Sequence, residues 1–188
     1  MSRIEQAFDR LLITSQGAIH TRIEEVSFDI PITNTKTKGY CYCLRTNQNG
    51  NLRLEDLIDF IDERIVDYAI PKKEIDEAKQ HQLETGSTSK ILRLRKKACQ
   101  LFTDLEKTGE GGEILLYILV QEFLKLPQLI SKMTLKTSGQ VHYQGADGIH
   151  VKYDNSTQSL NLYWGEAKMY KKINTAIKNC FGSLKGYL

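Results

Sequence analysis

Near the C-terminal end of the chain, a carboxylate and a lysine follow an alternating apolar pattern that could support phosphate chemistry. In Leu160–Lys168, apolar residues occupy alternate positions, and Glu166 and Lys168 continue the same parity. Because strand side chains alternate between two faces, the two charges are predicted on one otherwise apolar face. Burying such charges is costly unless they pair or serve a site. The pattern indicates a site at the rim of the core, with a solvated ion pair at a strand end as the alternative.

A second acid, Asp147, interrupts the extended segment that precedes this one. The turn signal Asp154–Thr157 joins the two segments and predicts an antiparallel hairpin that brings Asp147 alongside Glu166. Neighbouring carboxylates repel each other unless a cation lies between them. Mg²⁺ takes oxygen ligands at about 2.0–2.1 Å, commonly from one or two carboxylates plus substrate phosphates. The pair therefore indicates a magnesium site, although Asp147 between glycines could also be a plain turn residue.

A third acid, Glu113, is expected in the first turn of a helix over Glu113–Leu126 that Pro127 ends. The next seven residues, Ile114–Val120, are apolar, so this helix should be buried. A carboxylate at a helix N-terminus interacts favourably with the helix dipole. Glu110 has nearly the same claim, and either acid could be only a helix-terminal residue.

The composition excludes several classes of protein. The chain has 188 residues, of which 40% are hydrophobic and 26% charged, a composition typical of a globular protein. Its net charge of +3 is too small to indicate nucleic-acid binding by itself. Four scattered cysteines do not make a secreted disulfide scaffold. The acidic N-terminus lacks a signal-peptide pattern and no apolar run approaches the length of a membrane span. We therefore expect a cytoplasmic location and no membrane partner.

Other catalytic chemistries lack their motifs. Cys41 and Cys43 share a strand face, but no second pair of cysteines or histidines stands at zinc-ligand spacing. There is no Gly-x-Ser-x-Gly nucleophile elbow and no phosphate-binding P-loop. Any ATP-driven step is expected to come from another protein.

The elements that must position the acids divide into two parts. Helical patterns at 2–14, 54–68, 71–83 and 91–101, with extended stretches at 19–30 and 39–46, make residues 1–105 mainly helical with a small β element. After residue 105, a helix, extended segments at about 129–136, 140–152 and 159–169, and a helix at 171–184 give the order α-β-β-β-α. We predict an α/β core over residues 106–188 with a helical N-terminal extension.

These residues resemble a known family. The runs Gly109–Glu113, Gly145–Val151 and Trp164–Lys168 are similar to the PD-(D/E)xK nuclease superfamily. More closely they resemble HamA, the nuclease subunit of the Hachiman antiphage defence system, and the related AbpA. The resemblance implies a restriction-endonuclease-like core. That pattern adds a strand after the second helix, and the chain ends at Leu188, so either it is a fragment or another element closes the sheet.

The resemblance also implies roles for individual residues. Asp147, Glu166, the Ala167 carbonyl and Glu113 would hold Mg²⁺, with Mn²⁺ as a substitute, and Lys168 would orient the attacking water or stabilise charge on the phosphate. The expected activity is that of a magnesium-dependent deoxyribonuclease, an endonuclease or nickase, working with a HamB-like helicase. Because the faces of this chain's N-terminal helices exceed what the small sheet can cover, our hypothesis is that the helicase docks on them. The alternatives are a catalytically silent nuclease-fold module that binds DNA or the helicase, and an RNA-directed nuclease.

Basic residues could contact the nucleic acid. Lys171, Lys172 and Lys178 lie on the helix that follows the motif, where a phosphate backbone would pass. A second basic run extends over Lys90–Lys97. Both could equally be solvated surface charges, and the second could face a partner protein.

Overall fold

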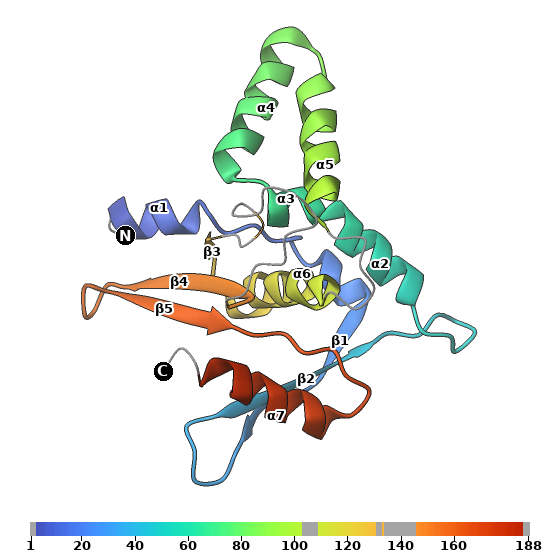
Figure 1. Ribbon diagram of the computed structural model, residues 1–188, viewed down its shortest axis with the longest axis vertical. Coiled ribbons are helices and arrows are strands. Elements are labelled where there is room, and N and C mark those ends of the chain that lie inside the picture. Colours follow the sequence, from blue (N-terminus) through green and yellow to red (C-terminus); the bar gives the residue numbers. More distant parts are fainter. Residues whose placement is uncertain (1–2, 103–108, 131–132, 134–145, 186–188) are drawn as a thin grey trace. The chain divides into compact units, whose positions relative to one another are not determined.

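The computed structural model describes residues 3–102, 109–130, 133 and 146–185, apart from the side chain of Phe28 (Figure 1). The chain divides into two compact units, Thr14–Glu63 and Met1–Ile13 with Arg64–Leu188. The predicted boundary between residues 105 and 106 lies outside the described residues. The α/β class is confirmed, with two small antiparallel sheets.

The smaller unit is a twisted hairpin with one helix. Strands β1 (Ile23–Pro31) and β2 (Lys38–Leu44) pair antiparallel with two irregularities in register. A 3₁₀ turn, η1 (Ala18–Thr21), precedes β1, so the predicted extended stretch starts four residues later than expected. A turn follows β2, with Gly50 at a φ of 78°. Helix α2 (Leu54–Glu63) completes the unit.

The larger unit begins with the predicted helices, with two differences. Helix α1 spans only Arg3–Asp9, and the helical pattern that runs past residue 64 breaks at Arg64, after which α3 (Ile65–Ala69) begins. Pro71 starts α4 (Lys72–Thr85) as predicted. The left-handed Gly86 ends it, and α5 (Ser89–Leu101) packs back along α4 (Figure 1).

The C-terminal half follows the predicted order α-β-β-β-α. Helix α6 (Glu110–Leu119) continues into the π-helical turn η2 (Val120–Leu124) and ends before Pro127. Strands β3 (Gln128–Ile130), β4 (Gly148–Asp154) and β5 (Ser159–Gly165) form an antiparallel sheet in that order. Helix α7 (Ile173–Leu184) follows. Helix α6 starts three residues earlier than predicted, so both Glu110 and Glu113 belong to its first turns.

The apolar face expected for β5 is only half covered in the described structure. Leu160, Leu162 and Trp164 are 45%, 50% and 43% exposed. The strand also ends at Gly165, so Glu166 and Lys168 lie in the segment after it. The prediction that alternation would carry both charges along a strand to residue 169 is therefore wrong.

One buried histidine ties the hairpin to the end of the long helix. The His150 side chain on β4 is 1% exposed, and its Nδ1 lies 3.0 Å from the carbonyl oxygen of Leu126. Its Nε2 has no hydrogen-bond partner among the described residues. Burial lowers the pKa of His150, so the neutral ring, with Nδ1 donating to Leu126, is the form that the fold holds.

This arrangement predicts a pH-dependent stability. The unfolded chain titrates His150 near the ordinary pKa of about 6.5, whereas the folded chain takes up that proton only at lower pH. Below about pH 6.5 the unfolded state binds more protons than the folded state does. The free energy of unfolding therefore decreases as the pH is lowered. Urea unfolding at pH 7.5 and 5.5 should show this loss in the wild type and a smaller loss in His150→Gln. His20→Gln, at an exposed histidine, is the control, and an unchanged pH loss in His150→Gln would contradict the assignment.

Candidate functional site

The β4–β5 register places Asp147 at the mouth of the hairpin. Gly148 pairs with Gly165, and one residue earlier the Asp147 amide donates to the Gly165 carbonyl at 2.9 Å. The Asp147 carboxylate in turn accepts a hydrogen bond from the Ala167 amide at 2.8 Å. The side chain is buried, at 8% exposed. These contacts place Asp147 beside the backbone segment that carries Glu166, as predicted.

Two glycines allow the start of α6 to rest on this end of the hairpin. A Cβ at Gly112 would lie 3.5 Å from the Ala167 Cβ and 3.0 Å from the Met169 side chain. A Cβ at Gly165 would lie 2.9 Å from Leu116. A Cβ at either point would force the Met169 or Leu116 side chain to shift, so glycine suits this close approach. It brings the first turns of α6 next to the segment that carries Glu166 and Lys168.

Both candidate acids of α6 are buried. Glu110 is 3% exposed and Glu113 is 5% exposed, which is unusual for glutamate unless the charge has partners. The Tyr68 hydroxyl, from α3, donates to Glu113 Oε2 at 3.3 Å. Because both glutamates are buried, burial does not decide which of them is the third acid of the site.

Tyr68 is a site residue that the sequence analysis missed. Its side chain is 0% exposed. Burial raises its pKa, and the nearby charges of Glu113, Asp147 and Glu110 raise it further, in that order. The buried Tyr68 hydroxyl therefore keeps its proton and contacts one of the three carboxylates, that of Glu113. The sequence signal that could have identified it is a tyrosine at a core position of a helix, because a buried phenol usually has a hydrogen-bond partner.

Glu166 and Lys168 form an ion pair beside the acids. The Glu166 side chain is 6% exposed and the Lys168 side chain 25%, and Lys168 Nζ donates to Glu166 Oε1. This hydrogen bond, with smaller contributions from the charges of Glu166 and Asp147, raises the pKa of Lys168. From α7, the Cys180 thiol donates weakly to the Glu166 carbonyl at 3.7 Å. This contact joins α7 to the segment that carries Glu166.

The four predicted residues lie in one region, but they do not form a ready-made metal cage. Within the described ranges, no group of three His, Cys, Asp or Glu side chains is arranged to hold an ion. One Asp147 oxygen accepts from Ala167, and one Glu166 oxygen is paired with Lys168. Carboxylate oxygens are nevertheless the ligand type that Mg²⁺ prefers. Ala167, the predicted carbonyl ligand, is half-buried between Glu166 and Lys168.

The three lysines predicted to contact nucleic acid follow Lys168 closely in the sequence. Lys171 and Lys172 precede α7, and Lys178 lies within it. All three are exposed. Their exposure is compatible with phosphate contacts and equally with plain solvation.

The fold and site describe a mixed α/β protein with acids gathered where a hairpin meets a helix start. A model of the HamA family matches residues 20–188, and the chain belongs to this family. HamA membership makes it a component of the Hachiman antiviral defence system. No curated protein and no solved structure matches the chain. No helix in the described part of the chain is long and apolar enough to pass through a membrane.

The contact between Tyr68 and Glu113 predicts a measurable stability difference. Tyr68→Phe keeps the ring but removes a buried donor to a carboxylate, which should lower the free energy of unfolding at pH 7 by about 1.5–3 kcal/mol. Tyr117→Phe is the matched control, because its hydroxyl donates to the neutral Asp67 carbonyl at 3.2 Å, and should cost about 0.5–1.5 kcal/mol. Denaturant unfolding measures both. A Tyr68 variant as stable as the wild type would show that the hydroxyl does not hold Glu113.

Proposed function

We propose that this HamA-family protein is a metal-dependent deoxyribonuclease, the cleaving subunit of a Hachiman complex with a helicase. The supporting observation is the gathering of Glu113, Asp147, Glu166 and Lys168 in one buried region of a HamA chain. The order α-β-β-β-α over the C-terminal half supports a restriction-endonuclease-like core.

The electrostatics of the site support a cation. Glu110, Glu113 and Asp147 all raise the pKa of Tyr68, so their charges lie near one another in a region with little solvent. Neighbouring carboxylates repel each other, and a cation between them relieves the repulsion. Lys168 supplies one positive charge, which pairs with Glu166. A divalent ion near Asp147 and Glu113 would add further positive charge.

In this proposal, Asp147, Glu166 and the Ala167 carbonyl would hold Mg²⁺ or Mn²⁺, with Glu113 completing the ligands. The ion would supply Lewis-acid stabilisation and an activated water for phosphodiester hydrolysis. Tyr68 orients Glu113 through its hydroxyl. Lys168 keeps its proton at Nζ, because the neighbouring carboxylates raise its pKa, and can bind a phosphate oxygen.

DNA and the helicase are the proposed partners. Lys171, Lys172 and Lys178 would contact the phosphate backbone on the α7 side of the site. The helicase would restrain the nuclease and deliver DNA to it, docking on the N-terminal helices. The ion pair of Lys168 with Glu166 suits a restrained state, in which both side chains satisfy each other until substrate arrives.

Cleavage of DNA tests the proposal directly. Supercoiled and linear DNA would be incubated with Mg²⁺ and the protein, with and without the helicase subunit. Asp147→Asn and Lys168→Ala should each reduce the rate by about 100-fold or more, because each removes charge from the proposed reaction centre. Gel electrophoresis separates nicked, linear and intact DNA.

Two residues on β4 provide matched controls for this assay. Asp154→Asn changes an acid at the far end of the same strand, and Lys152→Ala changes an exposed lysine on it. Both should retain wild-type rates. Equal cleavage by all five proteins would overturn the assigned site. DNA binding without any cleavage, even with the helicase present, would instead support the catalytically silent binding module. The ion pair of Lys168 with Glu166 is the observation that favours this alternative.

Metal binding has a readout that does not depend on cleavage. A ligand that binds only the folded state stabilises it by RT ln(1 + [L]/Kd), about 1.4 kcal/mol at ten times Kd. For a chain of this length, saturating Mg²⁺ or Mn²⁺ should raise Tm by about 3–5 °C. The shift should disappear in Asp147→Asn and persist in Asp154→Asn. A shift of the same size in both variants would place the ion elsewhere.

A further inference from the structure

Helix α5 carries a run of positive charge that the proposed site does not use. Between Ser89 and Leu101 it has five basic residues and no acid. The pair of helices α4 and α5, over residues 72–101, has eight basic and four acidic residues, a net charge of +4. This exceeds the net charge of +3 of the whole chain. The positive excess of the protein is therefore concentrated in these two helices.

One face of α5 packs on its neighbours, and the opposite face carries cations. Ala98 is buried, and Ile91 and Leu94 are half-buried, at the i, i+3 and i+7 spacing of a single helix face. This face packs against α3 and α4 (Figure 1). At 3.6 residues per turn, Arg93 and Lys96 lie on the side of α5 opposite to it. Both of these residues are exposed.

The acids of α4 do not neutralise this side of α5, because each of them has another partner. Glu74 pairs with Lys97 at 2.7 Å, Asp76 with Lys72 at 3.6 Å and Glu77 with Lys73 at 3.9 Å, and Glu84 accepts a hydrogen bond from Gln80 at 2.8 Å. Among the described residues, no ion pair involves Lys90, Arg93 or Lys96. These three exposed residues are the basic face of α5.

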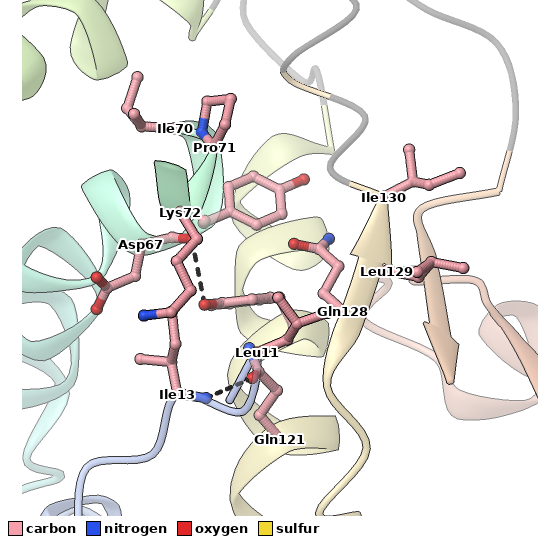
Figure 2. A pocket seen from close by; sticks show the side chains of 12 residues that line it. Leu11, Ile13, Asp67, Ile70, Pro71, Lys72, Gln121, Gln128, Leu129 and Ile130 are labelled. Atoms are coloured by element: carbon pink, nitrogen blue, oxygen red, sulfur yellow. Dashed lines mark hydrogen bonds between the residues drawn. The ribbon is translucent and has the colours of Figure 1, made fainter. Parts of the chain in front are cut away.

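The base of the two helices is held by buried contacts. The Tyr117 hydroxyl of α6 donates to the Asp67 carbonyl of α3 at 3.2 Å, beside a cavity that the start of α4 also lines (Figure 2). Arg64 joins the Asp67 carboxylate, at 3.1 Å, to the buried Glu122 of η2, at 3.6 Å. These contacts hold α3 against α6 and η2. Because α5 packs on α3, its basic face is presented from a fixed position.

We propose that the basic face of α5 binds the phosphate backbone of duplex DNA, a contact separate from the lysines of the proposed site. Its three cations span about 9 Å along the helix axis, at 1.5 Å per residue. Duplex DNA carries about one negative charge per 1.7 Å, so several phosphates lie within that reach. The inference rests on the proposed function only in taking DNA as the polyanion.

The composition of the two helices favours DNA over an acidic protein as the partner. Protein interfaces are usually anchored by Trp, Tyr or Arg in well-packed pockets, and lysine is depleted there. Residues 72–101 contain no Trp, Tyr or Phe. Leu92 is 64% exposed, but single exposed leucines are common on protein surfaces. Phosphate contacts, in comparison, need only positive charge.

The salt dependence of DNA binding tests the proposal. Binding of the full chain to a labelled duplex of about 20 base pairs would be measured by fluorescence anisotropy in EDTA at several KCl concentrations. Lys90→Gln, Arg93→Gln and Lys96→Gln should each make the slope of log K against log [KCl] shallower by about 0.9, and the triple variant by about 2.7. Lys79→Gln removes the same charge from an exposed position of α4 and should keep the wild-type slope.

Two duplexes of unrelated sequence should bind alike, because phosphate contacts do not read the bases. EDTA removes any metal, so this result is independent of whether the protein cleaves DNA. Absence of binding by the wild type, or a triple variant with the wild-type slope, would overturn the proposal. A triple variant that keeps DNA binding but no longer binds the helicase subunit would also overturn it and assign the basic face to an acidic protein surface. Thermal unfolding of each variant confirms that it is folded.

Discussion

The site depends on one contact between a hairpin and a helix: the approach of the α6 N-terminus to the end of β5, made possible by Gly112 and Gly165. A side chain at Gly112 or Gly165 would force the Met169 or Leu116 side chain to shift and would disturb this packing. The position of Glu113 relative to Asp147 and Tyr68 depends on the same contact. The chemistry of the acids thus rests on van der Waals distances between residues that carry no functional groups.

The hairpin register is the second requirement, and the sequence predicted it well. A short polar turn between two β-prone segments leaves little freedom in pairing, and a shift by one residue would move every side chain to the opposite face. Asp147 therefore had to face the residues after Gly165. What alternation did not predict is the end of the strand. Beyond Gly165 the chain leaves the sheet, so the positions of Glu166 and Lys168 follow from the contacts of Ala167 and Cys180 rather than from strand parity.

Tyr68 shows why sequence patterns identify only part of a site. In sequence it occupies an apolar position of a helical repeat, far from the acids, and its ring packs against Tyr117 at 5.3 Å between centroids. Only the tertiary arrangement of α3 against α6 reveals that its hydroxyl reaches Glu113. The early start of α6 is a similar case, because Gly109 in a left-handed conformation makes Glu110 the first helical residue. Local propensity alone could not separate Glu110 from Glu113.

Burial of several acids in one region sets up a balance between stability and function. Replacing buried ionic groups with well-packed apolar side chains of similar volume is often neutral or stabilising, so stability alone does not explain the burial of Glu110, Glu113 and Asp147. These carboxylates are instead retained around a phenol that keeps its proton and beside a lysine that keeps its charge. In the proposed nuclease, a divalent cation among these carboxylates would offset their mutual repulsion, which connects their burial to the proposed metal binding.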